Sequence, residues 1–207
     1  MKNSSNQDQM YLFSEEKAVS MLKKGDISGL SILVQKYQVK AVHTALLITH
    51  DLPSAEEVVQ DSFVKAFHKI SQFDETRPFS PWFLRIVINA AIKRAKKQKK
   101  FLAMDKPDDE NNIEDWLIDQ TKSPEELAES AEIQTIVWQA IEKLNPNQRA
   151  VIVLKYFLED TESEIVNQLG KPLTTIKWWL YIARQRLKQL IISDLKNDPV
   201  KMEDKNE

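Results

Sequence analysis

A stretch between Leu173 and Leu190 would place cations, hydrogen-bonding groups and aromatic rings together on one face of a helix, at about 100° per residue. The residues on that face are Thr174, Lys177, Trp178, Tyr181, Arg184, Gln185 and Lys188. No Asp or Glu occurs in the stretch, so nothing in it would repel a phosphate backbone. We interpret it as a helix that contacts DNA; a surface helix with solvated Lys and Arg is the alternative.

A second acid-free stretch, from Arg85 to Lys100, contains seven basic residues. Around it, one tryptophan, one asparagine and four cations fall within about one quadrant of a helical wheel. This basic stripe consists of Trp82, Arg85, Asn89, Lys93, Lys96 and Lys100. Cations follow phosphates, and an aromatic ring offers a stacking surface worth roughly 1 to 3 kcal/mol per base. The stripe predicts single-stranded nucleic-acid binding; a solvated basic surface beside a core tryptophan, or a membrane-surface helix, is the alternative.

The sequence lacks the patterns of catalytic and metal chemistry. His43, His50 and His68 give no HExxH or other close metal-ligand spacing. Three glycines make a glycine-rich phosphate loop implausible, and the absence of cysteine excludes disulfides and thiol chemistry. We therefore expect no catalytic residue, no cofactor-binding residue and no metal ligand, and no enzymatic activity.

The elements that position both faces are predicted to be helices, because glycines are few and alternating β-branched runs are rare. A helix is expected over Thr161–Leu169, ended by Gly170, with Pro172 opening the next. Two helices joined by a tight glycine-containing turn are typical of a helix-turn-helix. In the second helix, a core stripe is expected on the opposite face. Its members are Leu173, Ile176, Leu180, Ala183 and Leu187.

Two further helix starts bear on function. Ser54 with Glu57 three residues on forms a capping-box pattern, and Ser80 before Pro81 is typical of an N-cap followed by the first helical residue. The helix after Ser54 exposes a face made of Glu57, Asp61, Val64 and His68. Periodicity alone favours ordinary solvated surface for this face.

Charge is segregated along the chain, although the net charge is only -2. Between Asp105 and Glu132 there are eleven acidic residues and two basic ones, which we interpret as a linker. The expected fold is all-α, with two small helical domains joined by this acidic linker. The expected ranges are a tail at 1–13, an N-terminal domain at 14–101, the linker at 102–122, a C-terminal domain with the helix-turn-helix at 123–192, and a tail at 193–207.

The composition points to the cytoplasm. The content of 42% hydrophobic and 29% charged residues suits a soluble globular protein. No apolar run reaches the roughly 18 to 20 residues that span a bilayer, and the polar N-terminus MKNSSNQDQ has no signal-peptide core. We expect a cytoplasmic protein without membrane insertion.

Several motifs in order resemble a known family. AEEVVQDSFVKAF (55–67), FSPWFLRIVIN (79–89), LNPNQRAVIVLKYF (144–157) and GKPLTTIKWWLYIARQRL (170–187) are similar to segments of bacterial RNA polymerase sigma factors of the two-domain extracytoplasmic-function (ECF) group. The resemblance covers about 25–100 and 132–191. Motifs in this order, joined by a variable acidic linker, are far more specific than any one of them.

The resemblance implies a sigma factor that binds core RNA polymerase and directs promoter-specific, DNA-templated transcription initiation. The face with Glu57, Asp61, Val64 and His68, and Gln60 beside it, would dock on the polymerase. Phe79 and Lys97 would join the basic stripe in melting the promoter and reading its minus-ten element. Thr174, Thr175, Lys177, Trp178, Tyr181, Arg184 and Lys188 would read the minus-thirty-five element. Promoter DNA and core polymerase would be the partners, and an anti-sigma factor is a further partner of many family members.

The chain also departs from the family's pattern. Family members often carry Asp where this chain has Lys93, and small or basic residues where it has Trp178, Trp179, Tyr181 and Ile182. Glu159-Asp160-Thr161 replaces a more usual glycine-bearing turn. Two alternatives therefore stay open. One is a helix-turn-helix regulator that acts without the polymerase, and the other is a degenerate sigma-like protein that binds a partner without reading a promoter.

Overall fold

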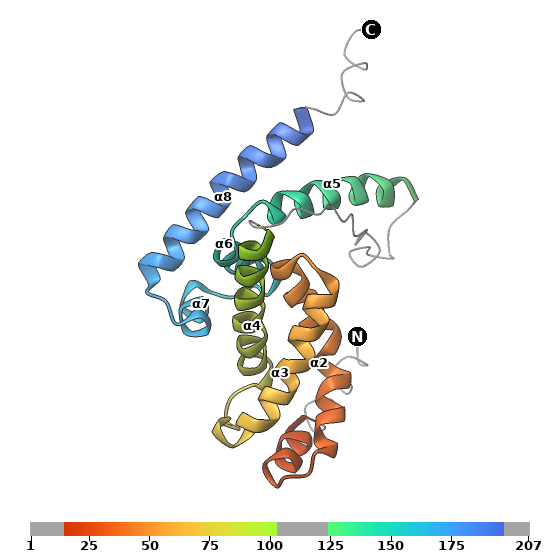
Figure 1. Ribbon diagram of the computed structural model, residues 1–207, viewed down its shortest axis with the longest axis vertical. Coiled ribbons are helices and arrows are strands. Elements are labelled where there is room, and N and C mark those ends of the chain that lie inside the picture. The colour runs from red at the N-terminus through yellow and green to blue at the C-terminus, as the bar shows by residue number, and fades with distance from the viewer. Residues whose placement is uncertain (1–14, 103–123, 197–207) are drawn as a thin grey trace, which may run out of the picture. The chain divides into compact units, whose positions relative to one another are not determined.

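The structure is a computed structural model that describes residues 15–102 and 124–196 (Figure 1). Within these ranges the chain forms helices and no strand, which confirms the all-α prediction. The chain divides into two compact units, Met1–Met104 and Asp105–Glu207. The tail predicted at 1–13 lies outside the described residues, and so does the linker predicted at 102–122 except for Leu102, which is the last residue of the third long helix.

The first unit is a bundle of three long helices preceded by a short helix at residues 15–23. The long helices are α2 (Ser28–Thr49), α3 (Leu52–Lys69) and α4 (Phe79–Leu102), and each packs against the other two. Their shared core is aromatic at its centre, where Phe63 stacks on Phe83 with 4.4 Å between ring centroids. Phe83, Val87 and Ala91 of α4 are fully buried and recur every four residues along one side of the helix.

The start of α3 differs from the prediction. Asp51, not Ser54, is the N-cap, and its carboxylate accepts a hydrogen bond of 2.8 Å from the Ser54 amide. Pro53 fits inside the first turn because its missing N–H would have no helical partner there. The Ser54 hydroxyl instead accepts hydrogen bonds from Arg94 Nε at 3.0 Å and Gln98 Nε2 at 2.8 Å. The serine that looked like a cap therefore joins α3 to α4.

The second unit contains α5 (Pro124–Glu142), α6 (Pro146–Ile152), α7 (Glu162–Leu169) and α8 (Leu173–Lys196). A π-helical turn at Val153–Phe157 extends α6. Asn145 and Thr161 are the N-caps of α6 and α7, and each makes reciprocal hydrogen bonds with the residue three positions on. α8 continues to Lys196, so the helix extends past residue 193, where a tail was expected.

The loop before α7 contains a strained residue. Glu159 has a φ of 60°, in the left-handed region that favours glycine. The loop is held by Lys155 Nζ, which donates to the Asp160 carbonyl at 3.2 Å, and by Gln168 Nε2, which donates to the Asp160 carboxylate at 2.6 Å. These contacts explain how a glutamate occupies the turn where a glycine was expected.

A close helix crossing generates a stability prediction. A Cβ atom added at Gly29 would lie 2.4 Å from the Ala18 carbonyl oxygen, so the helix at 15–23 and α2 would have to separate. Gly29→Ala normally favours a helix by up to about 1 kcal/mol, but here we expect the free energy of unfolding to fall by roughly 1 to 3 kcal/mol because the interface is overpacked. Urea denaturation measures this. Gln38→Ala, on the exposed side of α2, is the control and should change stability little; a stabilised Gly29→Ala protein would contradict the crossing geometry.

Candidate nucleic-acid interfaces

The basic stripe lies on the solvent side of α4. Arg85, Lys93, Lys96 and Lys100 are exposed, and so are Asn89 and Lys97. Asn89 Nδ2 donates to the Arg85 carbonyl at 2.8 Å, so its amide oxygen points away from the helix backbone's donors. α4 therefore presents a row of exposed cations, with Asn89 among them, over about four turns that start beside Trp82.

Trp82 begins the stripe as a half-buried ring. Its centroid lies 5.1 Å from that of Phe73 and 5.5 Å from that of Phe79, and part of the side chain remains exposed to solvent. The structure does not support the prediction that Phe79 contacts DNA. It is 1% exposed, because its ring is enclosed by Tyr37, Phe73, Trp82 and Phe83 at centroid distances of 5.5 to 5.7 Å. Phe79 supports the ring of Trp82 and offers no surface of its own.

Glu15 supports the same aromatic cluster and was missed by the sequence analysis. Its carboxylate is buried and accepts hydrogen bonds from Lys36 Nζ and the Tyr37 hydroxyl. Its other oxygen lies 3.4 Å from the Phe79 amide, the first N–H of α4. That N–H has no partner within its own helix, so Glu15 caps α4 from 64 residues away. Burial, reinforced by Glu15, raises the pKa of the Tyr37 hydroxyl, which keeps it protonated as a donor.

The loop between α3 and α4 is held at two points. Asp74 accepts hydrogen bonds from the Thr76 amide at 3.0 Å and the Thr76 hydroxyl at 2.7 Å, and these bonds lower the pKa of the Asp74 carboxyl. Lys23 pairs with Glu75 at 2.6 Å, which ties the loop to the helix at 15–23. Both contacts keep Phe73 in the position from which it packs on Trp82.

The predicted docking face is exposed along α3. Glu57, Gln60, Asp61, Val64 and His68 are all exposed, and Val64 is an apolar side chain with 53% of its area open to solvent. Glu57 also pairs with Arg94 of α4 at 2.8 Å. The structure thus brings the five predicted residues onto one helix face, and joins one end of that face to the helix that carries the basic stripe.

The helix-turn-helix has the predicted geometry. Gly170 adopts a φ of 62° and its amide donates to the Val166 carbonyl at 2.8 Å, which ends α7. The Pro172 carbonyl accepts from the Ile176 amide at 3.1 Å and so opens α8. Ile176, Leu180 and Ala183 are buried to within 1%. Leu173 was expected in this core but is 42% exposed, because it belongs to the first turn, before α8 reaches its neighbours.

The opposite side of α8 carries the predicted reading residues. Thr174, Lys177, Trp178, Tyr181, Arg184 and Lys188 are exposed, and Thr175 is half-buried. Lys177 Nζ lies 3.8 Å from a Glu162 carboxylate oxygen, and Arg184 Nε donates to the Leu180 carbonyl at 3.2 Å. A recognition helix with an apolar inner side and a cationic, aromatic outer side can enter a major groove.

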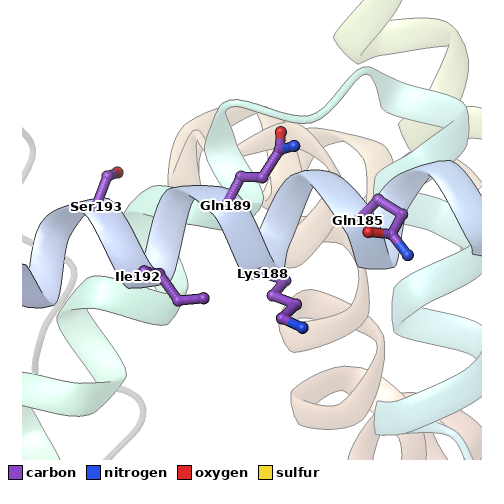
Figure 2. Close-up of a pocket in the computed structure, with 5 residues that line it drawn as sticks. All are labelled: Gln185, Lys188, Gln189, Ile192 and Ser193. Carbon is purple, nitrogen blue, oxygen red and sulfur yellow. The ribbon is translucent and has the colours of Figure 1, made fainter.

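The far end of α8 borders an open hollow lined by Gln185, Lys188, Gln189, Ile192 and Ser193 (Figure 2). These are amide, hydroxyl, aliphatic and single-amine side chains, and they contain no acid–base pair. Among residues 15–102 and 124–196, no group of three or more His, Cys, Asp or Glu side chains could hold a metal ion. No helix in the described part of the chain is long and apolar enough to cross a membrane.

Comparison with family models matches both units. Residues 33–101 match sigma-70 region 2, which spans most of α2 through α4. Residues 134–187 match sigma-70 region 4, which includes the helix-turn-helix. The two matches follow the chain in the order of the motifs.

Curated relatives cover nearly the whole chain. The ECF RNA polymerase sigma factor SigW of Bacillus subtilis (strain 168) is 29% identical over 177 residues, which are 84% of this chain and 95% of the relative. The ECF RNA polymerase sigma-E factor of Salmonella typhimurium (strain LT2) is 27% identical over 179 residues, or 84% of this chain and 92% of the relative.

Solved structures share the fold. CnrH, in complex with the cytosolic domain of CnrY, has a TM-score of 0.57 at 22% identity and covers 87% of this chain and 99% of its own. The sigma factor RpoE, in complex with the anti-sigma factor NepR from Bartonella quintana, has a TM-score of 0.58 at 21% identity, covering 78% and 98%.

The contacts of Glu15 can be tested by their effect on stability. Glu15→Ala leaves Lys36 and the Tyr37 hydroxyl without their shared acceptor and removes the cap of α4. We expect the free energy of unfolding to fall by about 2 kcal/mol, measured by urea denaturation of the full chain. Glu16→Ala is the matched control, because Glu16 is exposed on the same helix. Equal losses in the two variants would show that Glu15 does not hold α4.

Proposed function

The chain belongs to the sigma-70 family of bacterial RNA polymerase sigma factors, within the ECF group, and we propose from its geometry how each unit acts. As a sigma factor it binds core RNA polymerase and directs promoter-specific transcription initiation. The observation that carries this function is the pair of outward helix faces, α4 in one unit and α8 in the other, within the two matched regions.

In this proposal the N-terminal domain, residues 14–101, binds the polymerase and melts the promoter. Glu57, Gln60, Asp61, Val64 and His68 form the docking face. The basic stripe and Lys97 hold the separated non-template strand, since cations follow its phosphates and the exposed part of Trp82 can stack on a base. Phe79 contributes by supporting Trp82, because its own ring is enclosed.

The C-terminal domain, residues 123–192, reads the minus-thirty-five element through α8. Thr174, Thr175, Lys177, Trp178, Tyr181, Arg184 and Lys188 are the proposed contacts. Threonine hydroxyls and cations contact phosphates and base edges, and the beginning of a recognition helix lies deepest in the groove. The acidic segment at 102–122 links this domain to the first.

The protein is proposed to work in the cytoplasm without catalysis of its own, because RNA synthesis belongs to the polymerase. An anti-sigma factor is a proposed further partner. This rests on the two solved relatives, one of which is a complex with an anti-sigma factor and the other a complex with the cytosolic domain of CnrY.

The function is tested by run-off transcription. Core polymerase from the source organism is combined with the purified chain on fragments of the same genome. We expect discrete transcripts that core polymerase alone does not produce. Asp61→Arg should abolish both the transcripts and co-elution with core polymerase, because a cation replaces an acid at the centre of the docking face.

Glu16→Arg is the control for that reversal, since it makes the same exchange at an exposed position of another helix. Failure of the wild-type chain to bind core polymerase would favour a helix-turn-helix regulator that acts alone. Binding to core polymerase without any discrete transcript would favour a degenerate sigma-like protein. Either result would overturn the proposal.

The basic stripe is tested by salt dependence. Lys93→Gln with Lys96→Gln should weaken open-complex formation. The slope of log affinity against log salt should become shallower by about 0.7 to 0.9 for each phosphate contact removed. Lys17→Gln with Lys24→Gln, at exposed positions away from α4, should leave the slope unchanged. An unchanged slope in the α4 double variant would show that the stripe does not follow the DNA backbone.

A further inference from the structure

Two large aromatic side chains lie together on the outer side of α8. Trp178 is 59% exposed and Tyr181 is 57% exposed. They are three residues apart in a helix, so they are neighbours on its surface. An isolated exposed apolar residue is ordinary, but two adjacent aromatic rings on a helix that otherwise suits a DNA groove require a role.

The rings cannot turn into the domain. Ile176, Leu180 and Ala183 are buried to within 1% on the other side of α8, and they fix the rotation of the helix about its own axis. Trp178 and Tyr181 also fall within the first nine residues of α8 (Leu173–Lys196). This is the part of a recognition helix that approaches base edges.

Two of the cations on this side, Lys177 and Arg184, already make contacts within the protein. Lys177 is 3.8 Å from Glu162, and Arg184 Nε donates to the Leu180 carbonyl at 3.2 Å. Lys177 would have to leave Glu162 before binding a base or a phosphate. The aromatic rings need no such rearrangement, so they are preorganised for contact.

The chemistry of the rings selects one feature of DNA. Indole has a single polar atom, its N–H donor, and phenol has a single hydroxyl, so most of each surface is apolar. The apolar group on the base edges of the major groove is the C5-methyl of thymine. We propose that Trp178, together with Tyr181, is a specificity-determining residue of this sigma factor and selects thymine methyl groups in the minus-thirty-five element. This inference rests on the proposed function.

Charge favours DNA over a protein as the occupant of this surface. Thr174, Lys177, Arg184 and Lys188 surround the rings, and no acid occurs from Leu173 to Leu190. A polyanion with apolar groups on its exposed edges matches such a surface. Docking of a protein on Trp178 is treated as an outcome of the test.

The experiment uses holoenzyme, assembled from core polymerase and the full chain, and a promoter duplex recovered by run-off transcription. Each thymine of the minus-thirty-five region is replaced in turn by deoxyuridine, which removes only the C5-methyl group. We expect wild-type holoenzyme to bind about fourfold more weakly at one or two positions. Holoenzyme with Trp178→Ala should bind the thymine and deoxyuridine duplexes equally at those positions. Replacing the sensitive thymine pair by a 5-methylcytosine pair should weaken wild-type binding less than an unmodified cytosine pair does.

Gln189→Ala is the control, because Gln189 is exposed on α8 beyond the reading half of the helix and should keep the wild-type deoxyuridine profile. Trp178→Leu keeps an apolar side chain and should retain part of the sensitivity. The inference is overturned if deoxyuridine has no effect at any position. It is also overturned if Trp178→Ala lowers the affinity for thymine and deoxyuridine duplexes by the same factor, so that the difference between the two duplexes persists. That result would place Trp178 against protein or phosphate. Both results leave promoter-specific transcripts intact, whereas failure of the proposed function removes the transcripts themselves.

Discussion

The rotation of α4 about its own axis is the constraint on which the first unit depends. Phe83 stacks on Phe63 at 4.4 Å, and the cluster continues through Phe79 to Trp82. Aromatic rings are large and have few rotamers, so a helix held by several of them cannot rotate without opening the core. Every cation of the basic stripe faces outward because this inner side is occupied. The same packing leaves Trp82 half-buried, so the core and the proposed strand-holding surface share a side chain.

In the second unit, aliphatic residues fix the rotation of α8 about its own axis. Ile176, Leu180 and Ala183 hold α8 against the domain at intervals of three or four residues. The turn at Gly170 then sets the direction in which α8 leaves α7. Small and branched side chains fill the inner side, Trp179 is half-buried, and Trp178 and Tyr181 lie on the outer side. Trp178 and Tyr181 are exposed on that outer side, where the proposed function places promoter DNA.

Much of this arrangement could be predicted from sequence because it is local. Helical periodicity predicted the buried side chains of Ile176, Leu180 and Ala183 in α8, and the predicted helix end at Gly170 was confirmed. The errors concern contacts between distant segments. Nothing near Phe79 in the sequence shows that Tyr37 and Phe73 enclose it, and nothing near Glu15 shows that it caps a helix 64 residues away. The site assignments on α3, α4 and α8 remain predictions. A side chain must be exposed to contact a partner, but exposure is the same whichever partner binds.

The two helices proposed to face DNA differ in the kind of binding energy they can supply. The α4 stripe is rich in exposed lysines, and phosphate neutralisation by lysine gives affinity that is strong, salt-dependent and indifferent to sequence. On α8, Lys177 and Arg184 are partly engaged by the protein, while Trp178 and Tyr181 are exposed. Contacts from aromatic rings to base edges depend on sequence and little on salt. On the proposed function, the first unit would therefore bind the melted DNA, and the second would determine which promoter sequence is bound. A more basic α8 would bind DNA more tightly but would discriminate less between promoters, so on the proposed function the two exposed aromatic residues would favour selectivity over affinity.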